Sequence, residues 1–272
     1  MNIHTAPENY VFYNGVTMTN AIYCNGDVPT NWMLVKVDKQ TIDTIEDDGQ
    51  TIEWWNDIQQ NGERFDYSYA FCNSGYPCLS PPHPIKATNV MYMFMGCNFL
   101  ENASNILVHI TSETPNMMYV CANCSSMKKA PLFHFLKVPI VKTYTSMYAS
   151  CFSLESARVY WGDGTADPVT QRNACQNMFF KCWNLKDIDF GEEETGSPTK
   201  LDLSYCKELS MDSVRSLMLS LQWIPEGSAG TYEITLATET FEKLKNYSSY
   251  LFTFEAKGWT VKSMTREESE DE

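Results

Sequence analysis

The chain has 272 residues, of which 43% are hydrophobic and 13% aromatic, so it is long and apolar enough to bury a sizeable core. Its formal net charge of −14 argues against nucleic acid as a partner, because neutralising phosphates requires clustered Lys and Arg. No apolar run approaches the roughly eighteen residues of a membrane span, so we expect none.

Residues 1–64 read as a β-rich N-terminal cap or attachment region. The apolar run at 32–37 predicts a strand, and the Asn-Gly pairs at 14–15 and 25–26 are turn signals between short apolar runs. A small antiparallel unit is therefore expected ahead of the rest of the chain.

Residues 65–210 contain a repeat. Five times a cysteine is followed three residues later by Leu or Met, at Cys97–Leu100, Cys124–Met127, Cys151–Leu154, Cys182–Leu185 and Cys206–Leu209. Successive cysteines are 27, 27, 31 and 24 residues apart. A recurring spacing of this size is typical of stacked-repeat architectures.

Each repeat is expected to hold one short helix and one strand. Val90, Met93 and Phe94 precede Cys97 at i, i+3, i+4 and i+7, which is the spacing of one helix face. Strand-like residues follow at 157–161 and 188–190, and a degenerate earlier copy is expected at 69–71. Stacking such units would bury the cysteines in one continuous apolar column.

The motif resembles the BspA-type leucine-rich repeat, in which Met-Phe-x-x-Cys-x-x-Leu turns alternate with strands. Residues 93–100 and 178–185 match it well, whereas the second unit has Val120-Cys121 in place of Met-Phe. The resemblance implies an α/β leucine-rich-repeat-like solenoid with a β-rich N-terminal cap and an α/β C-terminal cap.

Residues 211–264 are expected to form the α/β C-terminal cap. Ser210 is a suitable N-cap for a helix over 211–222, followed by a strand at 232–237, a helix from Thr238 and a strand at 258–261. This ending is similar to one that closes BspA-type proteins of gut Bacteroidales bacteria and their phages. Residues 265–272 are acidic and are expected to be a disordered tail, with docking to a basic surface as the alternative.

Sequence motifs for metal or catalytic chemistry are weak. Cys121 and Cys124 form a C-x-x-C without a second pair, so reduced buried thiols are favoured over a zinc or redox site. Asp163 and Asp167 favour a tight turn over a calcium loop. We expect no enzyme, cofactor or metal, although a Ser/His/Asp set assembled by the fold stays an alternative.

The exposed strand face is the expected binding surface. Counting from each Leu or Met, one outward row contains Asn102, Lys129, Ser156 and Asp187, and the next contains Ser104, Pro131, Arg158 and Asp189. The candidate contact residues are Lys129, Arg158, Tyr160, Trp161, Asp187 and Asp189. Aromatic and Arg side chains of this kind are enriched in binding hot spots.

Two functions remain open. The first is a structural or adhesive phage virion protein, made in the host cytoplasm, that binds other virion proteins or a host surface protein or glycan. It fits the family resemblance and the sequence start, which lacks the features of a secretion signal. The second is a bacterial repeat protein, either a surface adhesin or a cytosolic interaction module.

Overall fold

The computed structural model describes residues 66–75, 84–136, 141–161, 175–191, 199–228 and 231–267, and five strands near the N-terminus. Those strands are β1 (Asn2–Thr5), β2 (Tyr10–Tyr13), β3 (Met18–Thr19), β4 (Ala21–Cys24) and β5 (Met33–Lys36). β1 pairs with β4, and β2 pairs with β3 and β5, all antiparallel. The strand expected at 32–37 is therefore present as β5, whereas the turn signals at 14–15 and 25–26 lie outside the described residues.

The segments before the repeat cysteines are successive turns and not helices, which corrects the expectation from the sequence. The N–H of Met95 donates to Tyr92 and that of Cys97 to Phe94, three residues back, at 3.2 and 3.1 Å. Between them the N–H of Gly96 reaches the carbonyl of Ala122 in the next repeat at 2.8 Å. Alternate amides thus bond within a repeat and between repeats, whereas every amide of an α-helix would bond within it.

Two residues in each turn segment have a positive φ. In one repeat these are Tyr92 and Gly96, with φ of 59° and 73°. The equivalent residues elsewhere are Tyr69 and Asn73, Tyr119 and Asn123, Ser146 and Ser150, and Asn177 and Lys181. The pair Tyr69 and Asn73 belongs to the degenerate copy expected at 69–71. Left-handed backbone is costly for residues other than Gly, and here bonds such as Tyr92 N–H to Met118 at 3.1 Å hold it in place.

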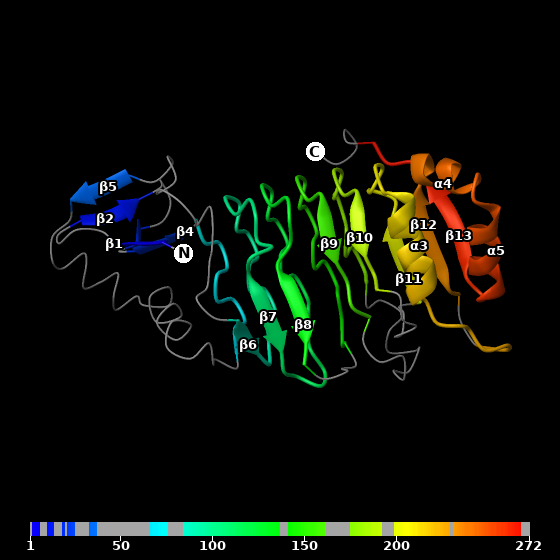
Figure 1. Ribbon diagram of the computed structural model, residues 1–272, viewed down its shortest axis with the longest axis horizontal. Helices are drawn as coiled ribbons and strands as arrows, with labels where there is room; N and C mark the ends of the chain where they lie inside the picture. Colours follow the sequence, from blue (N-terminus) through cyan, green and yellow to red (C-terminus); the bar gives the residue numbers. More distant parts are fainter. Residues whose placement is uncertain are drawn as a thin grey trace.

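Short parallel strands follow the turns. β6 (Ile85–Ala87), β7 (Leu107–Ile110) and β8 (Leu132–Phe135) form one sheet, and β9 (Ser156–Arg158) and β10 (Asp187–Asp189) form another. Isolated parallel bridges connect Asn102 with Lys129 and Lys129 with Ser156. Figure 1 shows the strands and turn segments of successive repeats lying side by side.

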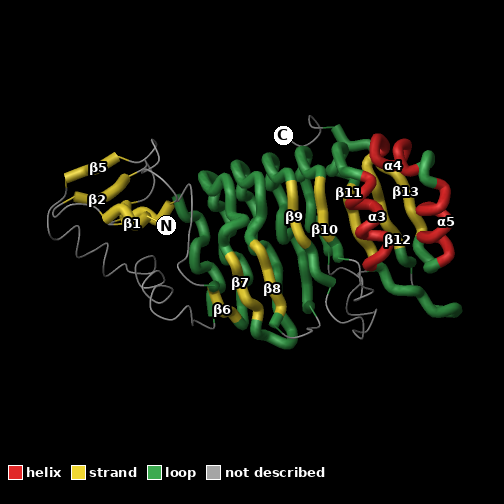
Figure 2. The backbone as a smooth tube through the Cα atoms, viewed as in Figure 1, coloured by secondary structure: helices red, strands yellow, loops and turns green. Residues whose placement is uncertain are grey.

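Among the described residues, the helices lie in the C-terminal part. β11 (Lys200–Leu203), β12 (Glu233–Ala237) and β13 (Thr260–Met264) form a parallel sheet in that order. The helices α3 (Met211–Ser220), α4 (Thr238–Leu244) and α5 (Ser248–Ala256) lie in the connections (Figure 2). Ser210 caps α3, as expected, by accepting from the N–H of Ser213 at 3.2 Å. The predicted helix–strand–helix–strand order is confirmed as α3, β12, α4 and β13, and α5 is an addition to it.

Helix α3 also covers the edge of β10. The hydroxyl of Ser213 accepts from the N–H of Ile188 at 2.8 Å, and that of Ser216 accepts from the N–H of Phe190 at 2.9 Å. The Ser216 hydroxyl donates in turn to the carbonyl of Gly191 at 3.1 Å. Serine side chains thereby occupy the place of a further strand and satisfy an edge that would otherwise be open.

The chain is thus a mixed α/β structure with small parallel sheets and few helices. Its core runs through the turn segments and strands and into the C-terminal sheet, and each repeat contributes a buried aliphatic residue such as Leu100, Leu154 or Leu185. Continuous burial from one repeat to the next explains why the Leu of the motif recurs.

Candidate interaction face

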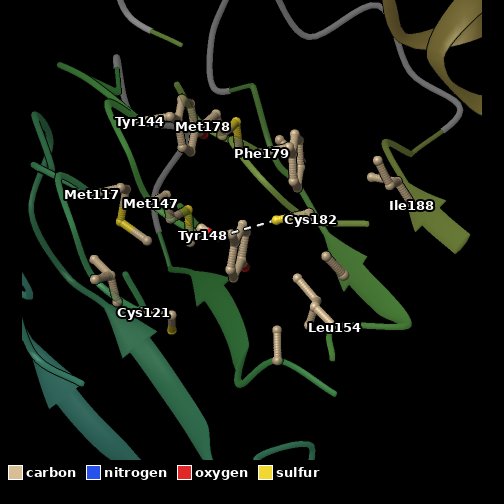
Figure 3. Close-up of a cluster of buried hydrophobic side chains, with 14 of the residues drawn as sticks. Met117, Cys121, Tyr144, Met147, Tyr148, Leu154, Met178, Phe179, Cys182 and Ile188 are labelled. Atoms are coloured by element: carbon tan, nitrogen blue, oxygen red, sulfur yellow. Dashed lines mark hydrogen bonds between the residues drawn. The ribbon is translucent and has the colours of Figure 1, made fainter. Parts of the chain in front are cut away.

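The repeat cysteines form a hydrogen-bonded column inside the turn segments. The thiol of Cys182 donates to the carbonyl of Tyr148 at 3.1 Å, as the dashed line in Figure 3 shows. The same bond joins Cys97 to Phe71, Cys124 to Phe94 and Cys151 to Cys121, at 2.9 to 3.0 Å. Each acceptor lies three residues before the cysteine position of the preceding repeat. Cysteine therefore supplies both a small apolar group and a donor for a buried carbonyl.

These thiols are unbridged and lie in the core. All eight cysteines whose side chains are described are free, and only Cys72 among them is not fully buried. Burial raises the pKa of Cys182 and of Cys206 well above the ordinary thiol value of 9.0. Among the described residues no three or more His, Cys, Asp or Glu side chains are grouped to hold a metal ion. Cys121 and Cys124 therefore belong to the core.

The expected row of outward residues is present on the strands. Asn102 pairs with Lys129, Lys129 with Ser156, and Ser156 with Asp187. In the next row Arg158 pairs with Asp189, and its Nε lies 3.2 Å from the Asp189 carboxylate. Both side chains are more than half exposed, at 64% and 56%, so solvent screens this ion pair and leaves it accessible.

Trp161 does not belong to this face, although the sequence placed it there. Its side chain is only 4% exposed, and its ring stacks on Phe190 at 5.4 Å. The indole N–H donates to the Ser220 hydroxyl at 3.1 Å. Because side chains alternate along a strand, Trp161 points inward. The half-buried Tyr160 beside it stacks on Phe135 at 4.9 Å.

Other expected sites fall partly outside the described residues. Asp163 and Asp167 are not described, and neither are residues 268–272 of the acidic tail. The start of the tail is held by Arg266, whose Nε donates to the Ser204 hydroxyl at 3.0 Å and whose guanidinium lies over the Tyr205 ring.

The structure also brings together residues that the repeat alignment separates. His109 follows its repeat cysteine by twelve residues and His134 by ten, so equal offsets do not match them. The register of β7 and β8 nevertheless pairs them, with ring centroids 5.3 Å apart. Lys86 pairs with His109 on the other side. The local alternation in Leu107–Ile110 and Leu132–Phe135 is the signal that would have aligned these strands.

Comparisons with known proteins bring no relative. No family model, no curated protein and no solved structure matches the chain. Within the described ranges, no helix has the length and apolar character needed to cross a membrane.

Proposed function

We propose that the chain is a non-enzymatic leucine-rich-repeat-like solenoid of the BspA type that presents its strand face to a protein or glycan partner. We place it in a phage virion, as a structural or adhesive component. The support for the repeat architecture is the recurrence of one turn geometry and one cysteine bond from repeat to repeat.

The observation that carries the binding proposal is the exposed face that holds Lys129 and Asp187 in one row and Arg158 and Asp189 in the next. β9 and β10 bury Ala157 and Ile188 on their opposite face, so the core fixes the backbone of Arg158, Asp187 and Asp189 while their charged ends meet solvent. A preorganised backbone loses little conformational freedom on binding, which favours affinity. Arg158 is the expected principal contact, with Lys129, Asp187 and Asp189 around it and Tyr160 at the margin.

Binding is tested with purified virions or host cells as the source of partner. Arg158→Ala is expected to weaken retention of the protein by at least about fivefold, a change of roughly 1 kcal/mol, without changing its melting temperature. The matched control is Lys243→Ala, because Lys243 is an exposed cation on α4, in the C-terminal part. Equal retention of both variants would contradict a role for the face.

Location is tested separately by mass spectrometry of purified particles. Presence of the chain in stoichiometric amounts supports a virion protein. Absence from the particle, with a surface or cytosolic pool in the bacterium, favours the bacterial repeat protein instead.

A further inference from the structure

Aromatic and basic side chains gather in the turn segments of the later repeats. The residue after the repeat cysteine is Asn98 in one early repeat and Ser125 in the next, and the Ser125 Oγ lies 3.4 Å from the Asn98 Oδ1. Further along the chain the same position holds Phe152, Trp183 and Lys207. Small polar side chains thus suffice for stacking at this position, so the larger ones indicate a further role.

Three of the rings and three cations pack together at the end of the repeats. They are the rings of Phe180, Trp183 and Tyr205 and the cations Lys181, Lys207 and Arg266, here called the cation–aromatic cluster. The Tyr205 ring meets the other two edge to face, with centroids 4.9 and 5.1 Å away. Each ring has one cation over it, 4.8 to 5.4 Å from its centroid. Contacts of this kind hold the charges in place while the side chains remain half-exposed.

The cluster concentrates positive charge on a chain whose formal net charge is −14. The Asp202 carboxylate lies 3.5 Å from the Arg266 guanidinium. Among the described residues no carboxylate forms an ion pair with Lys207, and the Glu208 that follows it is exposed. An ammonium group held over a ring still has donors for a carboxylate that approaches from solvent. The cluster is therefore suited to an acidic segment.

The acidic end of the sequence starts at this cluster. Arg266 is fixed there by the hydrogen bond from its Nε to the Ser204 hydroxyl at 3.0 Å. Residues 267–272 read Glu-Glu-Ser-Glu-Asp-Glu and carry five side-chain carboxylates. Five residues in an extended conformation span about 17 Å. Since neighbouring groups of the cluster lie about 5 Å apart, residues 268–272 are long enough to pass Trp183 and reach Lys181.

From the charge of the cluster and the position of Arg266 we infer that residues 268–272 fold back over the cation–aromatic cluster of their own chain. Their carboxylates would bind the ammonium groups of Lys207 and Lys181, and the backbone would cover Trp183. The cluster is then an anion-binding surface that the tail keeps closed, and an acidic segment of another protein gains access by displacing the tail. This surface belongs to the turn segments and is separate from the strand face that holds Arg158.

Tethering favours the tail over any free acidic segment. A short linker gives a tethered group an effective concentration of the order of 1 mM. Exposed ion pairs are individually weak, so an untethered segment of the same composition competes poorly at micromolar concentration. Because the contacts are ionic and solvent-exposed, salt weakens them, and ionic strength becomes the handle by which the tail is released.

Carbodiimide cross-linking of the intact chain, followed by mass spectrometry of the monomer, tests where the tail lies. Cross-links from residues 268–272 are expected on Lys207 and Lys181. Their yield should fall at least about threefold between roughly 0.01 M and 1 M salt, as the screening length shortens from about 30 to 3 Å. The control is Lys186, an exposed lysine on the strand side of the same repeat. Equal cross-linking of Lys186 and Lys207, or a yield that ignores salt, would overturn the inference.

A fluorescent hexaglutamate peptide tests whether the tail closes the cluster. Its binding is measured by anisotropy against the parent chain and against a neutral-tail variant with Glu268→Gln, Glu270→Gln, Asp271→Asn and Glu272→Gln. The variant is expected to bind the peptide at least about threefold more tightly, because the tethered competitor is gone. Equal affinity of the two chains, including no binding by either, would refute a closed anion-binding surface.

Single substitutions in the neutral-tail variant separate the cluster from a general effect of net charge. Lys207→Gln is expected to remove the gain in affinity, whereas Lys186→Gln deletes the same charge elsewhere and should keep it. Melting temperatures of both variants verify that each is folded. Equal loss of binding with the two changes would show that net charge alone attracts the peptide. None of these readouts involves Arg158, so this inference and the proposed function can fail separately.

Discussion

The Ser213 hydroxyl on α3 accepts a hydrogen bond from the backbone N–H of Ile188 on β10 at 2.8 Å. It lies 3.4 Å from the carbonyl of Lys186 as well. The Ser213 side chain thus provides the hydrogen-bond partner that the backbone of a neighbouring strand provides elsewhere in the sheet. The relationship also links the last parallel strand of the repeats to the first helix of the C-terminal part.

Replacing Ser213 with Ala should therefore destabilise the chain. The buried N–H of Ile188 would lose its partner, at a cost of about 1–3 kcal/mol in the free energy of unfolding. Urea denaturation measures this change. Ser228→Ala is the control, because the Ser228 side chain is exposed and bonds only locally. Equal midpoints for the two variants would show that water replaces the serine at no cost.

Cys124→Ala should cost more than Cys124→Ser. The hydroxyl of Ser can still donate to the carbonyl of Phe94, whereas Ala leaves that buried carbonyl with the N–H of Cys97 alone and loses one hydrogen bond, worth about 0.5–1.5 kcal/mol. Ser at this position loses apolar contacts but keeps the donor. Thermal and urea unfolding of the two variants give the comparison, and a more stable Ala variant would contradict the role of the thiol as donor.

Stability should fall in alkaline solution. Burial raises the pKa of Cys97, Cys151 and Cys182 in the folded chain, whereas unfolded thiols ionise near the ordinary value of 9.0. The stabilising contribution is fully present below 9.0 and is lost as pH rises towards the raised folded pKa. Between pH 9.0 and its folded pKa, each such thiol lowers the free energy of unfolding by roughly 1.4 kcal/mol per pH unit.

The variant Cys182→Ala isolates one thiol from other alkaline titrations. Its free energy of unfolding, measured in urea between about pH 7 and pH 10, should decline less steeply than that of the parent chain above 9.0. Parallel pH profiles for the two proteins would show that Cys182 ionises equally in both states.

Trp161→Ala and Arg158→Ala should separate core from surface. The buried Trp161 leaves a large cavity, so its loss is expected to cost about 3–5 kcal/mol in stability. Arg158 contributes one exposed ion pair, worth roughly 0–1 kcal/mol. Differential scanning calorimetry measures both, and a similar melting temperature for the two variants would place Trp161 outside the core.

Much of the repeat could be predicted because cysteine and leucine recur at near-constant spacing. The same spacing misled on the turn segments, since i, i+3, i+4 and i+7 positions also fall on one side of two successive turns. Glycine would have signalled the left-handed positions, but Tyr92 and Tyr119 occupy two of them. Their backbone is set by bonds to the next repeat, which local sequence does not reveal.

The candidate sites also divide into residues that the sequence predicts and residues that it does not. The row from Asn102 to Asp187 could be counted from the motif because the strands there keep one offset from the cysteines. The pairing of His109 with His134 could not, because β7 and β8 start at different offsets. The aromatic character of Trp161 suggested a binding role. The alternation of side chains along the strand instead puts Trp161 on the inner side, next to Tyr160.

The cysteine bonds constrain how such a chain can change its length. Each thiol from Cys97 to Cys151 finds its acceptor three residues before the cysteine position of the preceding repeat. Excising residues 98–124 would hand Cys151 the carbonyl of Phe94 in place of that of Cys121 and leave every donor matched. The same bond from Cys182 to Tyr148 spans a repeat of 31 residues, so the segment that connects two turn segments can vary in length without breaking the match. Removal of a whole repeat therefore keeps the buried thiol donors matched, which would let the number of repeats change without exposing an unpaired donor.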